Sequence, residues 1–253
     1  MSEPVLGIIG GTGLTNLSSL EVSRRQVVRT PYGEPSGALT FGEIRGLPVV
    51  FLARHGYGHT IVPHQVNYRA NLWAMHSVGV RKVVSVASVG GIAPELGPGV
   101  LAVPHQIIDY TWGRKSTFFE GPDQPVTHID FTHPYTLSLR EEILAAAHTA
   151  GESVVPQGVY AVTQGPRLET AAEIDRLERD GATMVGMTGM PEAALARELD
   201  VQYAAIAVVV NHAAGRGDSR DGISLDDIHA VMRQAVGRAR NILETVVAAH
   251  GRP

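Results

Sequence analysis

The chain of 253 residues contains no cysteine, which excludes several kinds of chemistry. It can form no disulfide, no thiolate metal site and no cysteine nucleophile. Aromatic residues make up only 6% of the chain, and charged residues, at 18%, give a net charge of −4 with no long basic run. A surface that coats nucleic acid needs clustered positive charge, so we expect no nucleic-acid partner.

Long hydrophobic runs are missing as well. The longest, such as Ala204 to Val210, fall far short of the roughly 20 residues that span a bilayer. The first residues show neither a basic region nor a continuous apolar signal core, so we expect a cytoplasmic protein with no membrane partner. Because 44% of the residues are hydrophobic and no repeat or linker interrupts the chain, the simplest organisation is a single domain over residues 1–253.

Strand-like and helix-like segments alternate along the chain. Apolar runs predict strands at Val5 to Ile9, Val49 to Leu52, Lys82 to Val86, Val100 to Ile108, Gly158 to Thr163, Met184 to Met187 and Tyr203 to Asn211. Helical spacing predicts helices at Val66 to Val78, Leu137 to Ala150, Thr170 to Asp180, Pro191 to Leu199 and Ser224 to Ala249. This order predicts an α/β domain with a mixed, largely parallel central sheet flanked by helices. Ligands of such sheets gather at the carboxyl ends of the strands.

Three short segments that follow apolar runs share a chemical character. They are Gly10-Gly11-Thr12-Gly13, Ala53-Arg54-His55-Gly56 and Gly186-Met187-Thr188-Gly189. Small residues let backbone N–H groups and hydroxyls approach an anion closely, and an arginine offers the forked donor that suits phosphate oxygens. Together they predict a phosphate site, although one glycine turn alone could be structural and Arg54 alone could form a surface ion pair.

Four motifs in one order resemble a known family. They are the GGTG turn, the ARHG…H…P…VNY…AN segment from Ala53 to Asn71, the QGPRLET segment from Gln164 to Thr170, and the VGMTGMPEAALARE segment from Val185 to Glu198. They resemble the trimeric purine nucleoside phosphorylases and methylthioadenosine phosphorylases over almost the whole chain. The resemblance implies a homotrimer or a dimer of trimers, in which the long loop from Asp109 to Thr136 crosses to a neighbouring subunit.

The resemblance also assigns the phosphate contacts. It places phosphate against Thr12, Arg54, His55 and Thr188. The chain departs from the family at Ala87, where relatives carry a polar residue that reaches phosphate or ribose. Ser88 is the candidate replacement, because its N–H and hydroxyl could both serve an anion, but a serine that caps a helix beside the glycine pair Gly90-Gly91 is an open alternative.

Two side chains bear on the choice of base. Glu169, when ionised, can only accept hydrogen bonds, so it suits the N1–H of a 6-oxopurine and not the N1 lone pair of adenine. Asn211 has an amide that could serve O6 and N7. The resemblance places both side chains at the base and makes them the catalytic residues. It also places His212 and Ala213 at the substrate. The adenine-specific branch has an aspartate pair around the position of Asn211, where this chain reads Asn211-His212-Ala213. Glu169 could instead be an exposed carboxylate at the start of the helix that begins near Thr170, where the helix dipole stabilises a negative charge.

The remaining substrate contacts come from the resemblance. Leu168 stands where relatives have an aromatic residue over the base, and Met187 should lie under the ribose. Leu225 and Ile228 match the positions near the 5′ substituent, where apolar side chains favour a methylthio group over a hydroxyl, although their spacing also suits core packing. His128 resembles the residue that a neighbouring subunit contributes to this pocket.

The expected activity is phosphate-dependent cleavage of a 6-oxopurine nucleoside with a 5′-methylthio group. Alternatives are phosphorolysis of inosine and guanosine, phosphorolysis of methylthioadenosine, and a nucleotide or anion sensor on the same fold. No cofactor is expected beyond inorganic phosphate as co-substrate. No metal is expected either, because His55, His59 and His64 lack the spacing and acidic companion of a known metal motif.

Overall fold

A mixed sheet forms the centre of the computed structural model, which describes residues 5–14, 17–122 and 124–250. Its strands are β1 (Val5–Gly10), β2 (Glu21–Gln26), β3 (Leu39–Ile44), β4 (Leu47–Ala53), β5 (Val80–Gly91), β6 (Leu101–Ala102), β7 (Gln106–Asp109), β8 (Val154–Val155), β9 (Val159–Val162), β10 (Met184–Gly186) and β11 (Gln202–His212). The main path runs β2-β3-β4-β1-β5-β10-β9-β7, and β11 pairs with β5 and continues through β6 to β8. In the centre of the sheet, β4, β1, β5 and β11 run parallel to one another. The pairs β2–β3, β3–β4 and β5–β10 are antiparallel, so the sheet is mixed.

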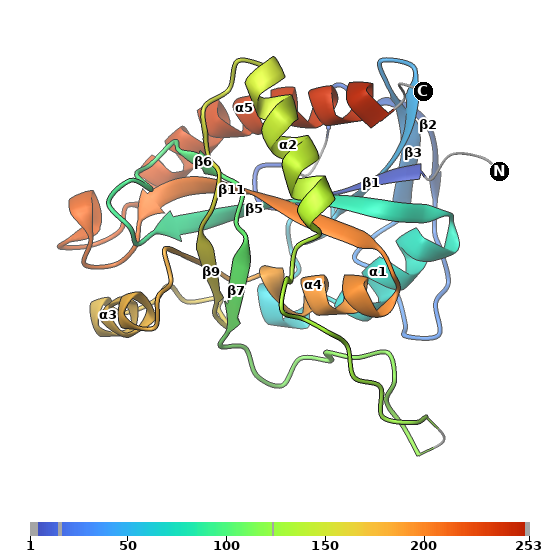
Figure 1. The fold of residues 1–253 in the computed structure, drawn as a ribbon, viewed down its shortest axis with the longest axis horizontal. Coiled ribbons are helices and arrows are strands. Elements are labelled where there is room, and N and C mark those ends of the chain that lie inside the picture. The colour runs from blue at the N-terminus through green and yellow to red at the C-terminus, as the bar shows by residue number, and fades with distance from the viewer. Residues whose placement is uncertain (1–4, 15–16, 123, 251–253) are drawn as a thin grey trace.

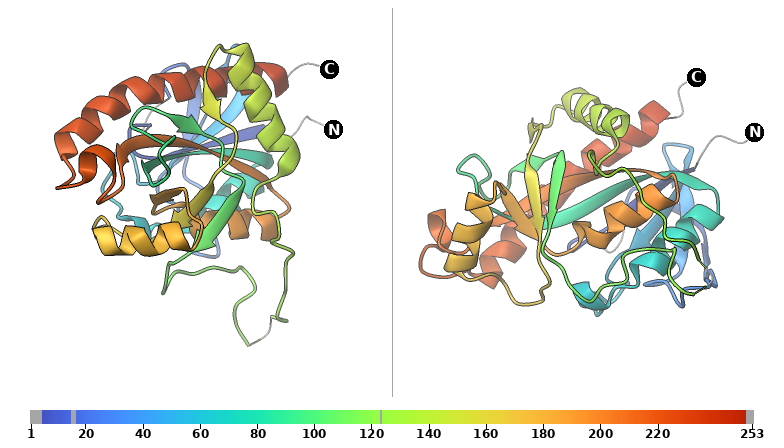
Figure 2. Two further views of the ribbon diagram at one scale, coloured as in Figure 1. Left: turned by 60° about the vertical axis from the view of Figure 1, so that its left-hand side comes forward. Right: turned by 60° about the horizontal axis from the view of Figure 1, so that its bottom comes forward.

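Helices cover both faces of this sheet (Figures 1 and 2). They are α1 (Tyr68–Ser77), α2 (Leu137–Thr149), α3 (Ala171–Arg179), α4 (Gly189–Glu198) and α5 (Leu225–His250), with short 3-10 turns η1 (Pro63–Gln65) and η2 (Gly217–Ser219). Helices α2 and α5 pack together against one face of β11, and α1 and α4 pack on the other. The predicted fold class is confirmed.

Strand β11 shows why both faces are apolar. Ile206 and Val208 lie in the core cluster on the α2 and α5 side, whereas Ala205 and Val209 lie in the cluster that contains residues of α1 and α4. Side chains alternate between the two faces of a strand, so a strand covered on both faces has a continuous apolar sequence. This pattern is what made the strand predictable.

Helix boundaries follow the local signals in the sequence. Thr170 accepts a hydrogen bond from the backbone of Glu173, whose side chain accepts one from the backbone of Thr170, which makes a capping box before α3. The Oγ of Ser224 accepts from the backbone N–H of Asp227 at 3.3 Å at the start of α5. The predicted helices are confirmed to within about two residues at each end, which is the usual uncertainty of helix boundaries.

Two predictions about strands were wrong. The expected strand from Val100 to Ile108 is two strands, β6 and β7, because Pro104 between them has no N–H to donate to a ladder. Strands β2, β3 and β8 were not predicted: β8 has only two residues, and β2 is exposed along its whole length at the edge of the sheet, so its sequence lacks an apolar pattern. No helix in the described ranges is long and apolar enough to cross a membrane.

Candidate active site

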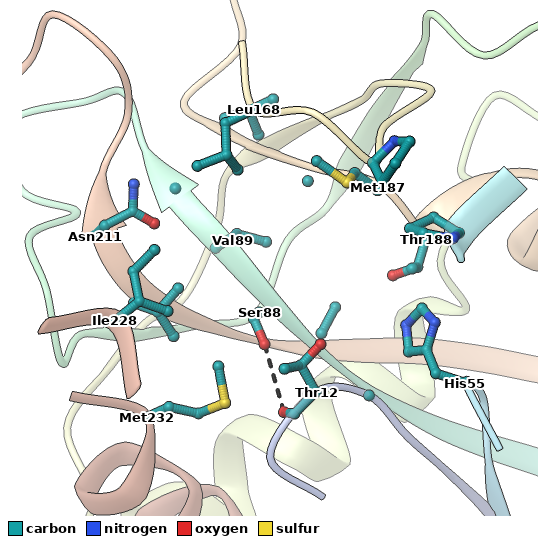
Figure 3. A pocket seen from close by; sticks show the side chains of 18 of the residues that line it. Thr12, His55, Ser88, Val89, Leu168, Met187, Thr188, Asn211, Ile228 and Met232 are labelled. Atoms are coloured by element: carbon teal, nitrogen blue, oxygen red, sulfur yellow. Dashed lines mark hydrogen bonds between the residues drawn. The ribbon is translucent and has the colours of Figure 1, made fainter. Parts of the chain in front are cut away.

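A cavity of about 420 Å³ lies where β1, β4, β5 and β11 end (Figure 3). Strand β10 meets the end of β5 from the opposite direction, with Val185 paired to Gly90. The lining residues that the sequence predicted are Thr12, Arg54, His55, Ser88, Leu168, Glu169, Met187, Thr188, Asn211, Ala213, Leu225 and Ile228. Residues spread over most of the chain therefore meet in one cavity, at the edge of the sheet where ligands were expected.

The glycine turn after β1 is tightly packed. A Cβ atom on Gly10 would lie 2.0 Å from the carbonyl oxygen of Leu14, and one on Gly11 would lie 2.6 Å from that of Val86. Neither position has room for a side chain. The glycines therefore let the turn sit against the end of β5, which brings Thr12 beside Ser88; the Ser88 hydroxyl lies 3.5 Å from the Thr12 carbonyl oxygen.

Arg54 is buried behind this turn and paired with Glu192. The guanidinium of Arg54, only 1% exposed, donates from Nε and Nη2 to the two carboxylate oxygens of Glu192 at 2.7 and 2.8 Å. Nη2 also donates to Ser85 Oγ, and Nη1 donates to the carbonyl of Val86. An arginine has five N–H donors, so one on Nη1 remains for a ligand. Burial alone would lower the pKa of Arg54, but the pairing with Glu192 raises it above its ordinary value.

Glu192 was missed by the sequence analysis. It is completely buried and also accepts hydrogen bonds from Ser85 Oγ and Tyr203 Oη, at 3.0 and 2.7 Å. Its position could have identified it: Glu192 lies among apolar residues of α4, and a buried carboxylate needs a charged partner. The alternative that Arg54 forms a surface ion pair is excluded, because its partner is this buried carboxylate.

His55 is neutral at pH 7 in this site. Its burial and the nearby charge of Arg54 lower its pKa from 6.5 to about 4. Its Nδ1 lies 2.8 Å from the carbonyl oxygen of Ile61, which can only accept, so the ring proton is on Nδ1. The other nitrogen, Nε2, is then an acceptor. Thr188, 7% exposed, points its hydroxyl toward the space between His55 and Thr12.

The glycine pair Gly90-Gly91, two residues after Ser88, belongs to a strand. Both glycines lie within β5, where a Cβ on Gly91 would come 1.7 Å from the carbonyl oxygen of Leu96. Gly91 therefore leaves room for the backbone of Leu96, and not for a ligand. Ser88, also within β5, caps no helix, so that alternative is excluded, and the side chain of Ala87 beside it is buried.

Glu169 and Asn211 lie at the other side of the cavity. Glu169 Oε1 accepts a hydrogen bond from the hydroxyl of Thr163 at 2.6 Å, and burial raises the pKa of this carboxyl above its ordinary value. The Nδ2 of Asn211 donates to the carbonyl of His212 at 2.6 Å. Both side chains keep further hydrogen-bonding capacity for a ligand. The carboxylate of Glu169 has a second oxygen, and the amide of Asn211 has a second N–H and an oxygen.

A bulge in β11 brings Asn211 to the cavity. Val209 pairs with Val89 and Asn211 with Gly90, so Val210 is an extra residue with no partner on β5. A bulge re-aims the side chains that follow it. Val210 and Asn211 consequently both line the cavity, although neighbouring residues of a regular strand point to opposite faces.

The third part of the cavity wall is apolar. It combines Leu168 and Met187 with four residues at the start of α5 and just before it: Ile223, Leu225, Ile228 and Met232. The sequence analysis missed Ile223 and Met232. In Figure 3, Ile228 and Met232 lie on the side of the cavity away from His55. Leu168 and Leu225 are 39% and 63% exposed, so this wall is open to solvent in the single chain.

Two predicted substrate residues do not line the cavity. His212 turns away from it: its Nδ1 accepts from the backbone N–H of Asp218 at 3.3 Å, and its ring packs against Gly217. His128 is exposed in the long segment between β7 and α2. His128 was predicted to reach the cavity of a neighbouring subunit, not that of its own chain. Among the described residues, no group of three or more acidic or histidine side chains is placed to hold a metal ion.

The fold and the cavity together define the class of protein. An α/β sheet whose strand ends enclose hydroxyls, a buried arginine and an apolar wall is suited to a small molecule that is polar at one end and apolar at the other. The chain belongs to the phosphorylase superfamily, whose family model matches residues 5–248. The family resemblance in the four motifs is confirmed.

Relatives are similar over nearly their whole length. A protein of Pseudomonas syringae pv. tomato named a probable S-methyl-5′-thioinosine phosphorylase is 51% identical over 97% of this chain and 99% of its own. The 6-oxopurine nucleoside phosphorylase of Pyrococcus furiosus is 40% identical over 97% and 92% of the two chains. The solved methylthioadenosine phosphorylase of Schistosoma mansoni, in complex with adenine, superposes with a TM-score of 0.94 at 30% identity, covering 98% of this chain and 92% of its own. The fold is therefore a nucleoside phosphorylase fold.

Proposed function

We propose that this chain is an S-methyl-5′-thioinosine phosphorylase, which converts its nucleoside and inorganic phosphate to hypoxanthine and 5-methylthioribose 1-phosphate. The observation that carries this proposal is the apolar wall at the start of α5, formed by Ile223, Leu225, Ile228 and Met232, beside a carboxylate at Glu169. The apolar wall suits a methylthio group, and the carboxylate suits a 6-oxopurine. The name of the Pseudomonas relative at 51% identity supports the same choice.

Phosphate would lie between Thr12, Ser88, His55 and Thr188. The unused N–H on Nη1 of Arg54 adds one charged donor from behind the glycine turn. The neutral His55 would accept a hydrogen bond from a protonated phosphate oxygen through Nε2. Three hydroxyls and an arginine that are fixed before the ligand arrives reduce the entropy that the attacking oxygen would otherwise lose.

Cleavage would then need no protein nucleophile. A phosphate oxygen forms a bond to C1′ while the N9–C1′ bond breaks. The purine leaves with the bonding electrons and takes up the proton that hydrogen phosphate loses. Asn211 would stabilise the purine as its charge grows, because a hydrogen bond that its amide donates to the base strengthens when the base becomes negative. Glu169 would hold the base in place by accepting from N1–H. No cofactor is required besides phosphate as co-substrate.

The decisive experiment is a panel of four nucleosides with phosphate: inosine, adenosine and their 5′-methylthio forms. We expect methylthioinosine to have the highest kcat/KM. Faster cleavage of methylthioadenosine contradicts the base assignment, and equal or faster cleavage of inosine contradicts the 5′ assignment. Cleavage at the same rate in phosphate-free buffer would make the protein a hydrolase, and no cleavage of any nucleoside would favour the sensor alternative.

Phosphorolysis of inosine and guanosine is the second candidate. It is favoured by the exposure of Leu225, since a side chain that is 63% exposed in one chain makes an incomplete apolar slot. The relative from Pyrococcus furiosus, named a 6-oxopurine nucleoside phosphorylase, supports this alternative. The same panel separates the two candidates.

We also propose that the chain works as one domain in a cytoplasmic homotrimer, or a dimer of trimers, with His128 reaching a neighbour's cavity. The exposed segment that carries His128 and the open apolar wall support this assembly. Sedimentation at the assay concentration is the test. We expect a trimer or hexamer, and a fully active monomer contradicts the proposal. A His128→Ala variant that retains full kcat/KM contradicts the role of His128 alone.

A further inference from the structure

Arg114 connects the long segment after β7 to the two loops that form the cavity. It lies between β7 and α2, in a stretch of residues 110–136 whose described part contains no helix or strand. This stretch extends away from the sheet (Figure 1). Arg114 is nevertheless half-buried, and its side chain donates to carbonyls in the body of the protein. It does not line the cavity.

The guanidinium of Arg114 donates to backbone carbonyls on both loops. Nη1 donates to the carbonyls of Met187 and Met190 at 2.8 and 2.5 Å. Nη2 donates to those of Thr163 and Gln164 at 3.2 and 3.1 Å, and Nε to the side chain of Gln164 at 3.3 Å. One planar group therefore joins the segment before Glu169 to the segment around Thr188.

Only an arginine can make this set of contacts. Its five donors lie in a rigid, planar fork, whereas a lysine has three donors on one atom and can replace only part of this set. No carboxylate in the described ranges forms an ion pair with Arg114, so its charge is directed at the carbonyl oxygens. The ring of Tyr68 completes the site, with the guanidinium carbon 5.6 Å from its centre.

Two of the contacted carbonyls, those of Thr163 and Met187, are close to residues that line the cavity. Thr163, whose carbonyl accepts from Arg114, donates through its hydroxyl to Glu169 at 2.6 Å. Met187 lines the cavity itself and immediately precedes Thr188. The distance between the carboxylate at the base and the hydroxyl at the phosphate is thus set in part by one guanidinium that touches neither ligand.

We propose that Arg114 is a positioning residue that fixes the base-binding and phosphate-binding loops relative to each other. The inference rests on the proposed function, because it assigns Glu169 to the base and Thr188 to phosphate. Phosphorolysis requires both substrates to be aligned at once, so loss of this link affects both binding sites together. A misplacement of about 1 Å can lower a rate by about 100-fold.

The test compares Arg114 with a matched arginine elsewhere. Arg140 also donates to backbone carbonyls, those of Val103, Pro104 and Pro156, but it lies away from the cavity. We expect Arg114→Met to raise the KM of both nucleoside and phosphate and to lower kcat/KM by about 100-fold, with Arg114→Lys in between. Arg140→Met and Arg140→Lys should leave both KM values within about twofold.

A second measurement does not depend on turnover. The chain has two tryptophans, and Trp112, 73% exposed, lies two residues before Arg114 with its backbone N–H donating to Gln164 Oε1 at 3.2 Å. In a Trp73→Phe background, the fluorescence anisotropy of Trp112 should fall in Arg114→Met and stay constant in Arg140→Met.

The outcomes are distinct. If Arg114→Met changes only one KM, changes neither, or affects activity no more than Arg140→Met, the positioning role is overturned. If Trp112 anisotropy is the same in both variants, the link between the segment and the loops is also overturned. If the unchanged protein cleaves no nucleoside, the proposed function fails, whereas the anisotropy comparison still decides whether Arg114 holds the loops.

Discussion

The two ends of the cavity are built in opposite ways. At the phosphate end, Arg54, His55 and Thr188 are 1%, 6% and 7% exposed and belong to strand ends inside the core. At the apolar end, Leu168 and Leu225 are 39% and 63% exposed and lie on a loop and on the first turn of α5. The end that we propose for phosphate is therefore part of what stabilises the fold, whereas Leu168 and Leu225 at the other end are largely exposed within the chain. Substitutions at the first should change stability and activity together, and substitutions at the second should change activity alone.

The sharpest test of this comparison is to break the buried ion pair. Removing one partner of a buried pair costs about 3–5 kcal/mol, because the other charge is left without compensation. We expect Arg54→Met to lower the free energy of unfolding by this amount, measured by urea denaturation, and to raise the KM for phosphate more than that for nucleoside. Arg167, which pairs with Glu173 on the surface at 68% and 42% exposure, is the control. Arg167→Met should cost less than about 1 kcal/mol, and equal costs contradict the comparison.

Acidification should also act at the phosphate end. The pKa of His55 is lowered from 6.5 to about 4, so on acidification the unfolded chain takes up this proton before the folded one. Stability is then lost as the pH falls from about 6.5 toward 4, by up to about 3 kcal/mol from this residue. In urea titrations at pH 7.5 and 4.5, His55→Gln should lose less stability than the unchanged protein. An identical loss in both removes His55 as the cause.

Substitutions of Glu169 and Asn211, the proposed base-binding residues, should change activity with little effect on the free energy of unfolding. Leaving a buried hydrogen-bonding group unpaired costs about 1–3 kcal/mol, so Glu169→Gln should lower kcat/KM for methylthioinosine by about 5- to 150-fold. Asn211→Asp should shift relative activity toward adenine nucleosides. Glu173→Gln, four residues along the same segment, is the control and should change kcat/KM by no more than about twofold. Loss of folding in Glu169→Gln, seen by urea denaturation, argues against a separable base site.

The smallest effect should come from Leu225. Small apolar groups contribute about 10- to 200-fold to substrate preference, and Leu225→Ser removes one part of the apolar wall, so the ratio of kcat/KM for methylthioinosine to inosine should fall by about 10-fold. Stability should change by less than about 0.5 kcal/mol. Leu137 is a close control, because it also begins a helix and is 62% exposed, but it lies outside the cavity. A Leu137→Ser variant with the same change in preference contradicts the 5′ assignment.

Local patterns in the sequence were enough for most of the fold. Continuous apolar runs identified the buried strands, because a strand covered on both faces needs apolar residues at every position. Helical spacing identified the helices. Glycines, hydroxyls and Arg54 after strands indicated the polar part of the cavity wall, and the family resemblance indicated the rest. Edge strand β2 and the break at Pro104 were missed because an exposed strand and a short one carry little periodic signal.

Contacts between distant residues were decided only by the tertiary structure. Arg54 and Glu192 are 138 positions apart, and no local pattern states that one neutralises the other. The bulge at Val210 exists only relative to β5, and it decides that Asn211 enters the cavity while His212 leaves it. Arg114 acts on loops 49 or more residues further along the chain. Sequence alone thus determined which segments are strands, helices and small-residue turns, since those follow from local sterics and burial. Only folding determined which charges, carbonyls and side chains meet, because pairing depends on distances in space.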